Sequence, residues 1–226
     1  MRPPPQRSTA PCLVSRWTIT ASLLLTGFLV LPGANTAPAQ PSVAPSSVRN
    51  GVLLVASPTL IDPNFREAVV LIIEHGSGGT LGVILNRATD VLLSDALPDF
   101  APLKGTSYRL FAGGPVDRTR LLLLFRLRKA PTEARSIFDG VYIGGAPAML
   151  EQFITHPNST DKFRAFAGYA GWAPGQLDFE MLRGAWATLP PDAASIFDLD
   201  PAMLWSDSIS RLQAPRVISN GSMQGK

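Results

Sequence analysis

The sequence predicts a single α+β domain, because its strand-like runs come in succession and most of its helical patterns follow later. The chain has 226 residues, of which 46% are hydrophobic, so it is long enough to bury one substantial core. Apolar, β-branched runs recur from Val52 onward and are separated by glycine and proline turns. This order differs from the regular alternation of strands and helices that is typical of α/β proteins.

The N-terminal segment is predicted to be an export leader. Three arginines precede a charge-free apolar run over residues 17–31, and Ala37-Pro38-Ala39 has the small-residue spacing of a signal-peptidase site. The run is shorter than the ~20 residues that a membrane-spanning helix needs, which favours cleavage over an uncleaved anchor. The predicted organisation is a signal peptide over residues 1–39, a flexible linker over 40–48, a folded domain over 49–214 and a loose tail over 215–226.

The leader predicts export to the periplasm or out of the cell, with an uncleaved, membrane-anchored form as an alternative. It contains three of the 20 basic residues and none of the 17 acidic ones, so the rest of the chain has no net charge. A neutral domain lacks the overall positive field expected of a nucleic-acid binder. The one cysteine, Cys12, lies in the leader, so we expect no disulfide, thiol nucleophile or cysteine-metal site in the mature chain.

The first half of the domain is predicted to contain four strands and one short helix. The run AVVLIIE is continuously apolar, so its strand is expected to be buried on both faces. Gly76-Ser77-Gly78-Gly79 connects it to the next strand and predicts a β-hairpin. The expected strands cover residues 52–56, 68–74, 80–86 and 108–112, and the expected helix covers 91–97 and is stopped by Pro98.

A further strand is predicted over residues 120–128, after a turn at Gly113-Gly114-Pro115. Alternation places Leu121, Leu123, Phe125 and Leu127 on one face and Arg120, Leu122, Leu124, Arg126 and Arg128 on the other. We expect the first face to be core and the second to be solvated and half basic.

The second half of the domain is predicted to alternate strands with helices. Pro147 and Pro174 each stand at the first turn of an expected helix, and Gly184 stands at the C′ position where the second of these helices ends. Asp200-Pro201 is an N-cap and first-turn pair that predicts a terminal helix. The expected strands cover residues 141–143, 163–172 and 185–189.

Familiar catalytic and cofactor motifs fail on particular residues. The G-x-S-x-G pattern around Ser77 would need a glycine where His75 stands, so Ser77 is interpreted as a hairpin tip. The G-x-G-x-x-G pattern fails because Leu81 occupies its third glycine position. His75 and His156 are the only histidines, so a three-histidine metal site is impossible. We therefore expect no metal and no cofactor.

A cluster of basic residues is the one feature that suggests a nucleic-acid surface. Its members are Arg118, Arg120, Arg126, Arg128, Lys129 and Arg135, with Asp117 and Glu133 among them. No aromatic platform for base stacking is interleaved with them, since Phe125 falls on the opposite face. A solvated outer sheet face is the interpretation that we prefer.

Glu74 and His75 end the apolar second strand, where ionisable side chains cost stability unless they find partners. One interpretation is that they satisfy backbone groups of the adjacent loop. The alternative is that they form the acid/base pair of a hydrolase or transferase.

The stretch from Phe166 to Leu177 is the most distinctive in the chain. It contains three glycines together with Tyr169 and Trp172. Glycines allow a backbone or a ligand to approach closely, and the two aromatic residues combine large apolar surfaces with polar groups. We expect this stretch to join a core strand to the Pro174 helix, and we expect Gly171→Val to unfold the domain.

Several motifs, taken in order, resemble the YqgE/AlgH family over the chain from Arg49 to Leu212. They are Ser57-Pro58-Thr59-Leu60, Asp62-Pro63-Asn64-Phe65, Val69-Val70, Glu74-His75, the run from Gly79 to Asn86, Gly113-Gly114-Pro115-Val116, Gly168-Tyr169-Ala170-Gly171-Trp172, Pro174-Gly175-Gln176-Leu177 and Ala185-Trp186. The resemblance implies a single α+β domain whose bifurcated, mostly antiparallel sheet is folded into a pseudo-barrel with a few helices. It implies no established catalytic activity. Family members carry a label as transcriptional regulators without a recognisable DNA-binding motif, and they are usually cytoplasmic and lack a leader.

We therefore expect an exported, non-enzymatic binding or regulatory domain without catalytic residues. Its candidate binding surface consists of polar residues, aromatic residues and glycines at strand ends, namely Glu74, His75, Asn86, Gly113, Gly114, Tyr169, Gly171 and Trp172. The expected partner is a protein or a small molecule, nucleic acid is not expected, and membrane contact is expected only through an uncleaved leader. The alternatives are a transcriptional regulator as the family label says, a cytoplasmic protein, and an enzyme that uses Glu74 and His75.

Overall fold

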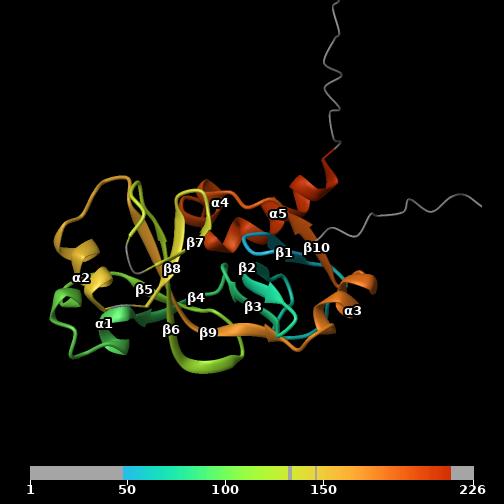
Figure 1. Cartoon of the computed structure of the whole chain (residues 1–226), viewed down its shortest axis with the longest axis horizontal. Coiled ribbons are helices and arrows are strands. Elements are labelled where there is room, and N and C mark those ends of the chain that lie inside the picture. The colour runs from blue at the N-terminus through green and yellow to red at the C-terminus, as the bar shows by residue number, and fades with distance from the viewer. Residues whose placement is uncertain (1–47, 132–133, 146, 215–226) are drawn as a thin grey trace, which may run out of the picture. The chain divides into compact units, whose positions relative to one another are not determined.

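A computed structural model describes residues 48–131, 134–145 and 147–214, which form an α+β domain with a curled, mostly antiparallel sheet and several helices (Figure 1). The predicted fold class is confirmed. The predicted signal peptide, the predicted tail and all of the predicted linker except Val48 lie outside these residues. Within the described ranges, no helix combines the length and apolar character needed to cross a bilayer.

The sheet contains ten strands among the described residues, in the order β10-β1-β2-β3-β9-β6-β8-β7, with β4 and β5 beside this path. The strands are β1 (Leu53–Ala56), β2 (Val69–Gly76), β3 (Gly79–Ile84), β4 (Ala88–Leu92), β5 (Arg109–Ala112), β6 (Val116–Arg126), β7 (Arg135–Phe138), β8 (Val141–Gly144), β9 (Lys162–Trp172) and β10 (Trp186–Leu189). One pair, β5 with β9, is parallel, and the other pairs are antiparallel.

Strand β9 is where the sheet divides. Its last residues, Ala170 to Trp172, pair with β3, whereas residues 162–167 pair with β6 and residues 165–167 with β5 on the other edge. The stretch that the sequence marked as distinctive therefore belongs to the strand that joins both halves of the sheet.

The helices cover parts of the sheet and its rim (Figure 1). They are α1 (Leu93–Ala96), α2 (Pro147–Thr155), α3 (Gln176–Leu182), α4 (Ala193–Phe197) and α5 (Leu204–Gln213), with short 3-10 turns η1 (Ala101–Leu103) and η2 (Pro201–Met203). The helix expected at Pro147 is confirmed, whereas the one expected to start at Pro174 begins at Gln176, after the N-cap Gly175. The terminal helix is present as α5, but Asp200 caps the preceding turn η2, where its carboxylate accepts a hydrogen bond from the Ala202 N–H at 3.0 Å. Asp192 caps α4 in the same way, which satisfies N–H groups that the first turn leaves free.

Three apolar clusters form the core, and β6 lies between two of them. Leu124 is fully buried in the first cluster, whereas Leu123 and Phe125 are buried in the third. The prediction that the Leu122–Leu124 face is solvated is wrong, because Ile196 and Phe197 of α4 belong to the cluster that covers it. Arg126, at the end of this face, forms an ion pair with Asp198 and is not simply solvated.

Two strands were not predicted. Ala88 to Leu92 forms β4, and Arg135 to Phe138 forms β7. The helix predicted over residues 91–97 is present only as the shorter α1, because Val91 and Leu92 belong to β4. Both strands are short, and all of their residues are exposed or half-buried. Such strands carry little of the apolar alternation on which sequence-based assignment depends.

Glycines matter most where β5 leads into β6 and crosses β9. A Cβ on Gly114 would overlap the backbone carbonyl of Tyr169, and a Cβ on Gly113 would overlap that of Gly168. Gly168 itself has a φ of +72°, which favours glycine. Gly171 is less constrained, since a Cβ there would meet the edge of the Tyr169 ring at 3.2 Å. The backbone crossing at Gly114, more than Gly171, is therefore the place where a side chain cannot fit.

Candidate functional site

Five of the eight residues predicted to form a binding surface line one groove. The hairpin groove, as we name it, lies between the β2–β3 hairpin, the end of β9 and Val116, and has a volume of about 590 Å³. The five residues are Glu74, His75, Tyr169, Gly171 and Trp172. They meet because β3 pairs directly with β9, with Thr80 opposite Trp172 and Leu81 opposite Gly171.

The hairpin brings two adjacent polar residues to the groove wall. Gly76 pairs with Gly79, so Ser77 and Gly78 alone form the predicted tip, which is confirmed. The register shifts between Ile72 and Glu74, and such a bulge changes where the following side chains point. Glu74 is exposed and His75 is half-buried.

Both of these polar residues have partners within the domain. The Glu74 carboxylate lies 3.6 Å from the Arg135 guanidinium. The Nδ1 atom of His75 and the Thr80 hydroxyl are 2.7 Å apart, and the His75 backbone N–H donates to the Asn50 side-chain oxygen at 2.8 Å. No hydrogen bond joins Glu74 to His75 in the described part of the chain.

The two aromatic residues of the groove have different environments. Tyr169 is half-buried, and the Arg120 guanidinium lies 5.5 Å from its ring centre, within the range of a cation–π contact. Trp172 is only 4% exposed and donates its indole N–H to Oε2 of Glu180 at 3.0 Å. Trp186 donates to the same oxygen at 2.8 Å. Trp172 is thus mainly a core residue, whereas Tyr169 presents more surface to the groove.

The other three predicted residues serve the backbone outside the hairpin groove. The Asn86 side-chain oxygen accepts a hydrogen bond from the Val69 N–H at 2.9 Å, and its amide donates to the Glu67 carbonyl at 2.8 Å. Glu67 has a positive φ of 55°, so Asn86 holds a strained loop in place. Gly113 and Gly114 allow the chain crossing described above.

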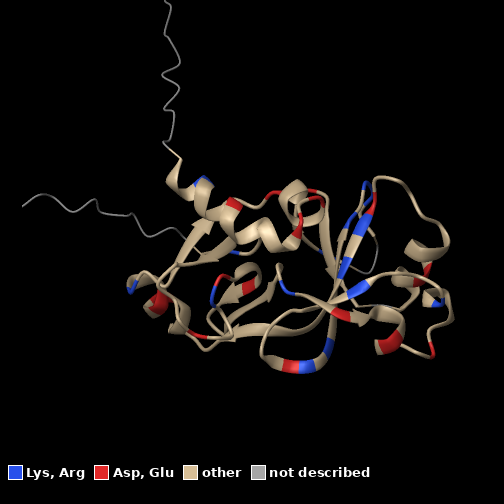
Figure 2. Cartoon of the chain, turned by 180° about the vertical axis from the view of Figure 1, so that it is seen from behind, with Lys and Arg blue, Asp and Glu red and all other residues tan. Residues whose placement is uncertain are grey.

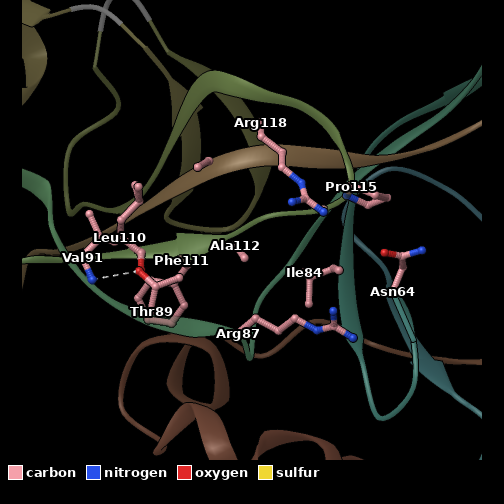
Figure 3. A pocket seen from close by; sticks show the side chains of 12 residues that line it. Asn64, Ile84, Arg87, Thr89, Val91, Leu110, Phe111, Ala112, Pro115 and Arg118 are labelled. Carbon is pink, nitrogen blue, oxygen red and sulfur yellow. Dashed lines mark hydrogen bonds between the residues drawn. The ribbon is translucent and has the colours of Figure 1, made fainter. Parts of the chain in front are cut away.

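A second cavity, which the sequence did not suggest, is lined in part by Gly114 and Pro115 of the glycine turn. We name it the arginine pocket; it has a volume of about 250 Å³ between β4, β5 and the start of β6. Figure 3 shows Arg87, from the connection between β3 and β4, and Arg118, from the start of β6, on one side of it, with Val91, Leu110 and Phe111 at the opposite end. Arg87 follows Asn86, and Arg118 follows the glycine turn, so no local motif links the two.

The predicted basic cluster is divided among separate contacts. Arg126 binds Asp198 through two nitrogens at 2.7 and 3.1 Å, Arg135 approaches Glu74, and Arg120 lies over Tyr169. Figure 2 shows basic and acidic segments interspersed along the ribbon. Three of the six residues are therefore engaged in separate contacts and do not contribute to one uncompensated basic strip.

Asp198 is the acidic centre of the largest charged cluster. Hydrogen bonds from Arg126 and then Lys162 lower the pKa of Asp198 to about 2. Nearby Arg164 is buried, donates to the Leu85 and Leu199 carbonyls at 3.2 and 3.4 Å, and has a pKa lowered by burial to about 10. Asp198 thus compensates several cations where β6, β9 and α4 meet. Among the described residues, no group of three His, Cys, Asp or Glu side chains is arranged to hold a metal ion.

Comparison with known proteins gives matches over most of this domain. A family model described as AlgH-like matches residues 53–216. The chain is 37% identical over 167 residues to the UPF0301 protein SCO2948 of Streptomyces coelicolor, covering 71% of this chain and 85% of that protein. It is 36% identical over 181 residues to a UPF0301 protein of Mycolicibacterium smegmatis, covering 76% and 88%.

Two solved structures are similar in fold. The solution structure of the AlgH protein from Pseudomonas aeruginosa matches with a TM-score of 0.62 and 26% identity, over 80% of this chain and 98% of that one. The crystal structure of protein DIP2367 from Corynebacterium diphtheriae matches with a TM-score of 0.61 and 26% identity, over 76% of this chain and 90% of that one. None of these names states an activity.

Proposed function

The chain belongs to the AlgH-like family, and from this premise we propose that it is a non-enzymatic binding or regulatory domain whose partner occupies the hairpin groove. The observation that carries the proposal is the meeting of Glu74, His75 and Tyr169 around one groove of about 590 Å³. This volume is within the ~300–1,000 Å³ of typical ligand pockets, and polar and aromatic groups share its lining.

The contacts of the ionisable residues support binding over catalysis. Glu74 is compensated by Arg135, and Nδ1 of His75 is engaged by the Thr80 hydroxyl. Among the described residues no contact joins Glu74 to His75, so the two do not form the coupled carboxylate–imidazole pair that the enzymatic alternative would use. The groove therefore offers recognition groups: a carboxylate, an imidazole and a phenol.

A photo-crosslinking experiment tests the proposal. A benzophenone amino acid replaces Ser77 at the exposed hairpin tip in cells that express the full chain, and Glu151 on α2 serves as the remote control position. We expect a discrete crosslinked species at position 77, absent at position 151 and lost when Tyr169→Ala is added. Equal crosslinking at both positions would contradict the assignment of the groove.

The second candidate function is an enzyme that uses Glu74 and His75, and one observation favours it: both side chains line the same groove. A broad hydrolase screen of the purified full chain discriminates between the two functions. Turnover that His75→Gln and Glu74→Gln both abolish, while the remote His156→Gln retains it, would replace the binding proposal with an enzymatic one.

We also propose that the domain is exported, on the strength of the leader pattern in residues 1–39. Cell fractionation followed by N-terminal sequencing tests this. Export predicts a product that begins at Gln40 in the periplasmic or secreted fraction. An intact N-terminus in the cytoplasm would contradict it and would reopen the transcriptional-regulator alternative, which a salt-dependent gel shift of the protein would then have to support.

A further inference from the structure

The arginine pocket combines two cationic groups with an apolar wall. Its polar lining comes mainly from Arg87, Arg118 and the amide of Asn64, and the rest is largely apolar, including Val91 and Phe111. No aspartate or glutamate belongs to the lining. In Figure 3 the guanidinium groups and Asn64 lie toward one end, together with Ile84 and Pro115, and Val91, Leu110 and Phe111 lie toward the other.

Arg87 is only partly satisfied by the protein. Its Nη2 atom donates to the backbone carbonyls of Pro63 and Arg66 at 3.3 and 3.4 Å, which are long hydrogen bonds. No carboxylate of the described residues lies within ion-pair distance of it. Burial lowers the pKa of Arg87, and the more distant Asp62 carboxylate partly offsets this lowering. A guanidinium has five N–H donors, so several remain for a ligand.

Arg118 is freer still. It is exposed at the start of β6, and its side chain makes no hydrogen bond or ion pair with any described residue. The neighbouring Asp117 carboxylate is engaged by the Thr119 hydroxyl at 2.9 Å. Two arginines that approach one cavity from separate segments would repel each other, and an oxyanion between them removes that repulsion while it accepts charge-assisted hydrogen bonds.

The opposite end of the pocket is apolar and indicates that the ligand has an apolar part. Val91 is 46% exposed although it is apolar, and Phe111, a core residue that is 8% exposed, lines the pocket beside it. A ligand with an apolar body would cover this surface and gain from its removal from water. The volume of about 250 Å³ lies below the ~300–1,000 Å³ range of drug-sized ligands, so the occupant must be small.

We propose that the arginine pocket binds a small organic acid, with its oxyanion between Arg87 and Arg118 and its apolar body against Val91 and Phe111. This site is separate from the hairpin groove, with which it shares no lining residue. The shared chemistry is an oxyanion on a compact apolar group. Carboxylates and phosphate monoesters both meet this description, and the experiment tells them apart.

An NMR titration of the isotope-labelled full chain tests the proposal with three probes of similar body: benzoate, phenyl phosphate and benzyl alcohol. We expect at least one of the two acids to shift the amide signals of Thr89 and Ala112, with a dissociation constant on the order of 1 mM or tighter. The tighter acid identifies the preferred oxyanion. Benzyl alcohol, which has the body without the charge, should bind at least tenfold more weakly.

Two variants and two controls locate the site. Arg118→Gln should weaken binding of the acid about tenfold through loss of one charge-assisted contact, and Val91→Ser about threefold through loss of apolar contact. Arg128→Gln, an exposed arginine elsewhere, and Tyr169→Ala in the hairpin groove should leave it unchanged. The proposal is overturned if neither acid binds, if the alcohol binds as well as the acids, or if Tyr169→Ala weakens binding as much as Arg118→Gln does.

Discussion

Arg126 and Asp198 form a two-point ion pair, with nitrogen–oxygen distances of 2.7 and 3.1 Å, although 72 positions separate them in the chain. Lys162 binds the same carboxylate from β9. The pair thus joins the end of β6 to the residue that follows α4, at the edge of the first core cluster.

The substitution Asp198→Asn should destabilise the domain, because it removes the charge that compensates Arg126 and Lys162. The carboxyl side chain is 41% exposed, so solvent screening limits the loss to about 1 kcal/mol, near the upper end for such pairs. Urea unfolding at neutral pH measures it. Asp90→Asn is the matched control, since the Asp90–Arg109 pair is fully exposed on its acidic side, and a loss equal to that of the control would contradict the prediction.

The stability of the domain should fall as the pH drops from about 4 to about 2. The folded-state pKa of Asp198 is lowered to about 2 from an ordinary value of 3.8. A lowered carboxyl pKa contributes stability above the ordinary value, and this contribution is lost as protons bind the folded state. The pKa of Asp192 is lowered too, chiefly by the Ser195 hydroxyl, and acts in the same direction. Denaturation at pH 5, 4 and 3 should show the gap between wild type and Asp198→Asn closing; a constant gap would argue against the linkage.

Glu180 should contribute more to the free energy of unfolding than an ordinary surface glutamate does. Its Oε2 atom accepts both buried indole N–H groups, those of Trp172 and Trp186. Glu180→Ala leaves these two donors without an acceptor and should cost about 2–3 kcal/mol, whereas Glu180→Gln keeps an acceptor and should cost about 1 kcal/mol. Thermal unfolding compares them with Glu151→Ala on the exposed side of α2. If Glu180→Ala matches that control, the shared acceptor has no role in stability.

Gly114→Ala should prevent folding or cost more than ~4 kcal/mol, because the new Cβ would overlap the Tyr169 backbone, which cannot rotate away. Gly78→Ala at the hairpin tip is the control, since nothing lies within 4 Å of its Cβ position. Circular dichroism and the melting temperature decide the outcome. A Gly114→Ala protein as stable as Gly78→Ala would mean that the crossing of β6 over β9 is looser than the structure shows.

Much of the fold could be predicted because its central strands are strongly patterned. Strand β2 is continuously apolar, and β9 carries the glycine and aromatic signature, so both were recognised from the sequence. Strands β4 and β7 were missed because they are short and all of their residues are exposed or half-buried, so neither shows clear apolar alternation. The partner of β4 lies about twenty positions away in β5, whereas β7 pairs with β8, which follows it directly. The burial of Leu124 was missed because α4, which covers that face, lies far along the chain and the residues near Leu124 do not indicate this contact.

The candidate site shows the same division. Glu74, His75 and Tyr169 could be selected because strand ends with polar or aromatic residues are common at binding surfaces, and the pairing of β3 with β9 brings them together. Asn86 has the same local appearance, yet its side chain serves the backbone of the Glu67 loop. Arg118, in the arginine pocket, could not be selected from the sequence, because it forms a candidate site only together with Arg87, which comes from another segment.

The position of β10 has a consequence for how the chain folds. Leu53 at the start of the domain pairs with Leu189 near its end, and β1 is enclosed between β2 and β10. Contacts between residues so distant in the chain form slowly, because a long loop must close before they stabilise anything. During synthesis the first strand therefore lacks one of its two neighbours until nearly the whole domain has been made, and the nascent chain remains incompletely folded for most of its elongation.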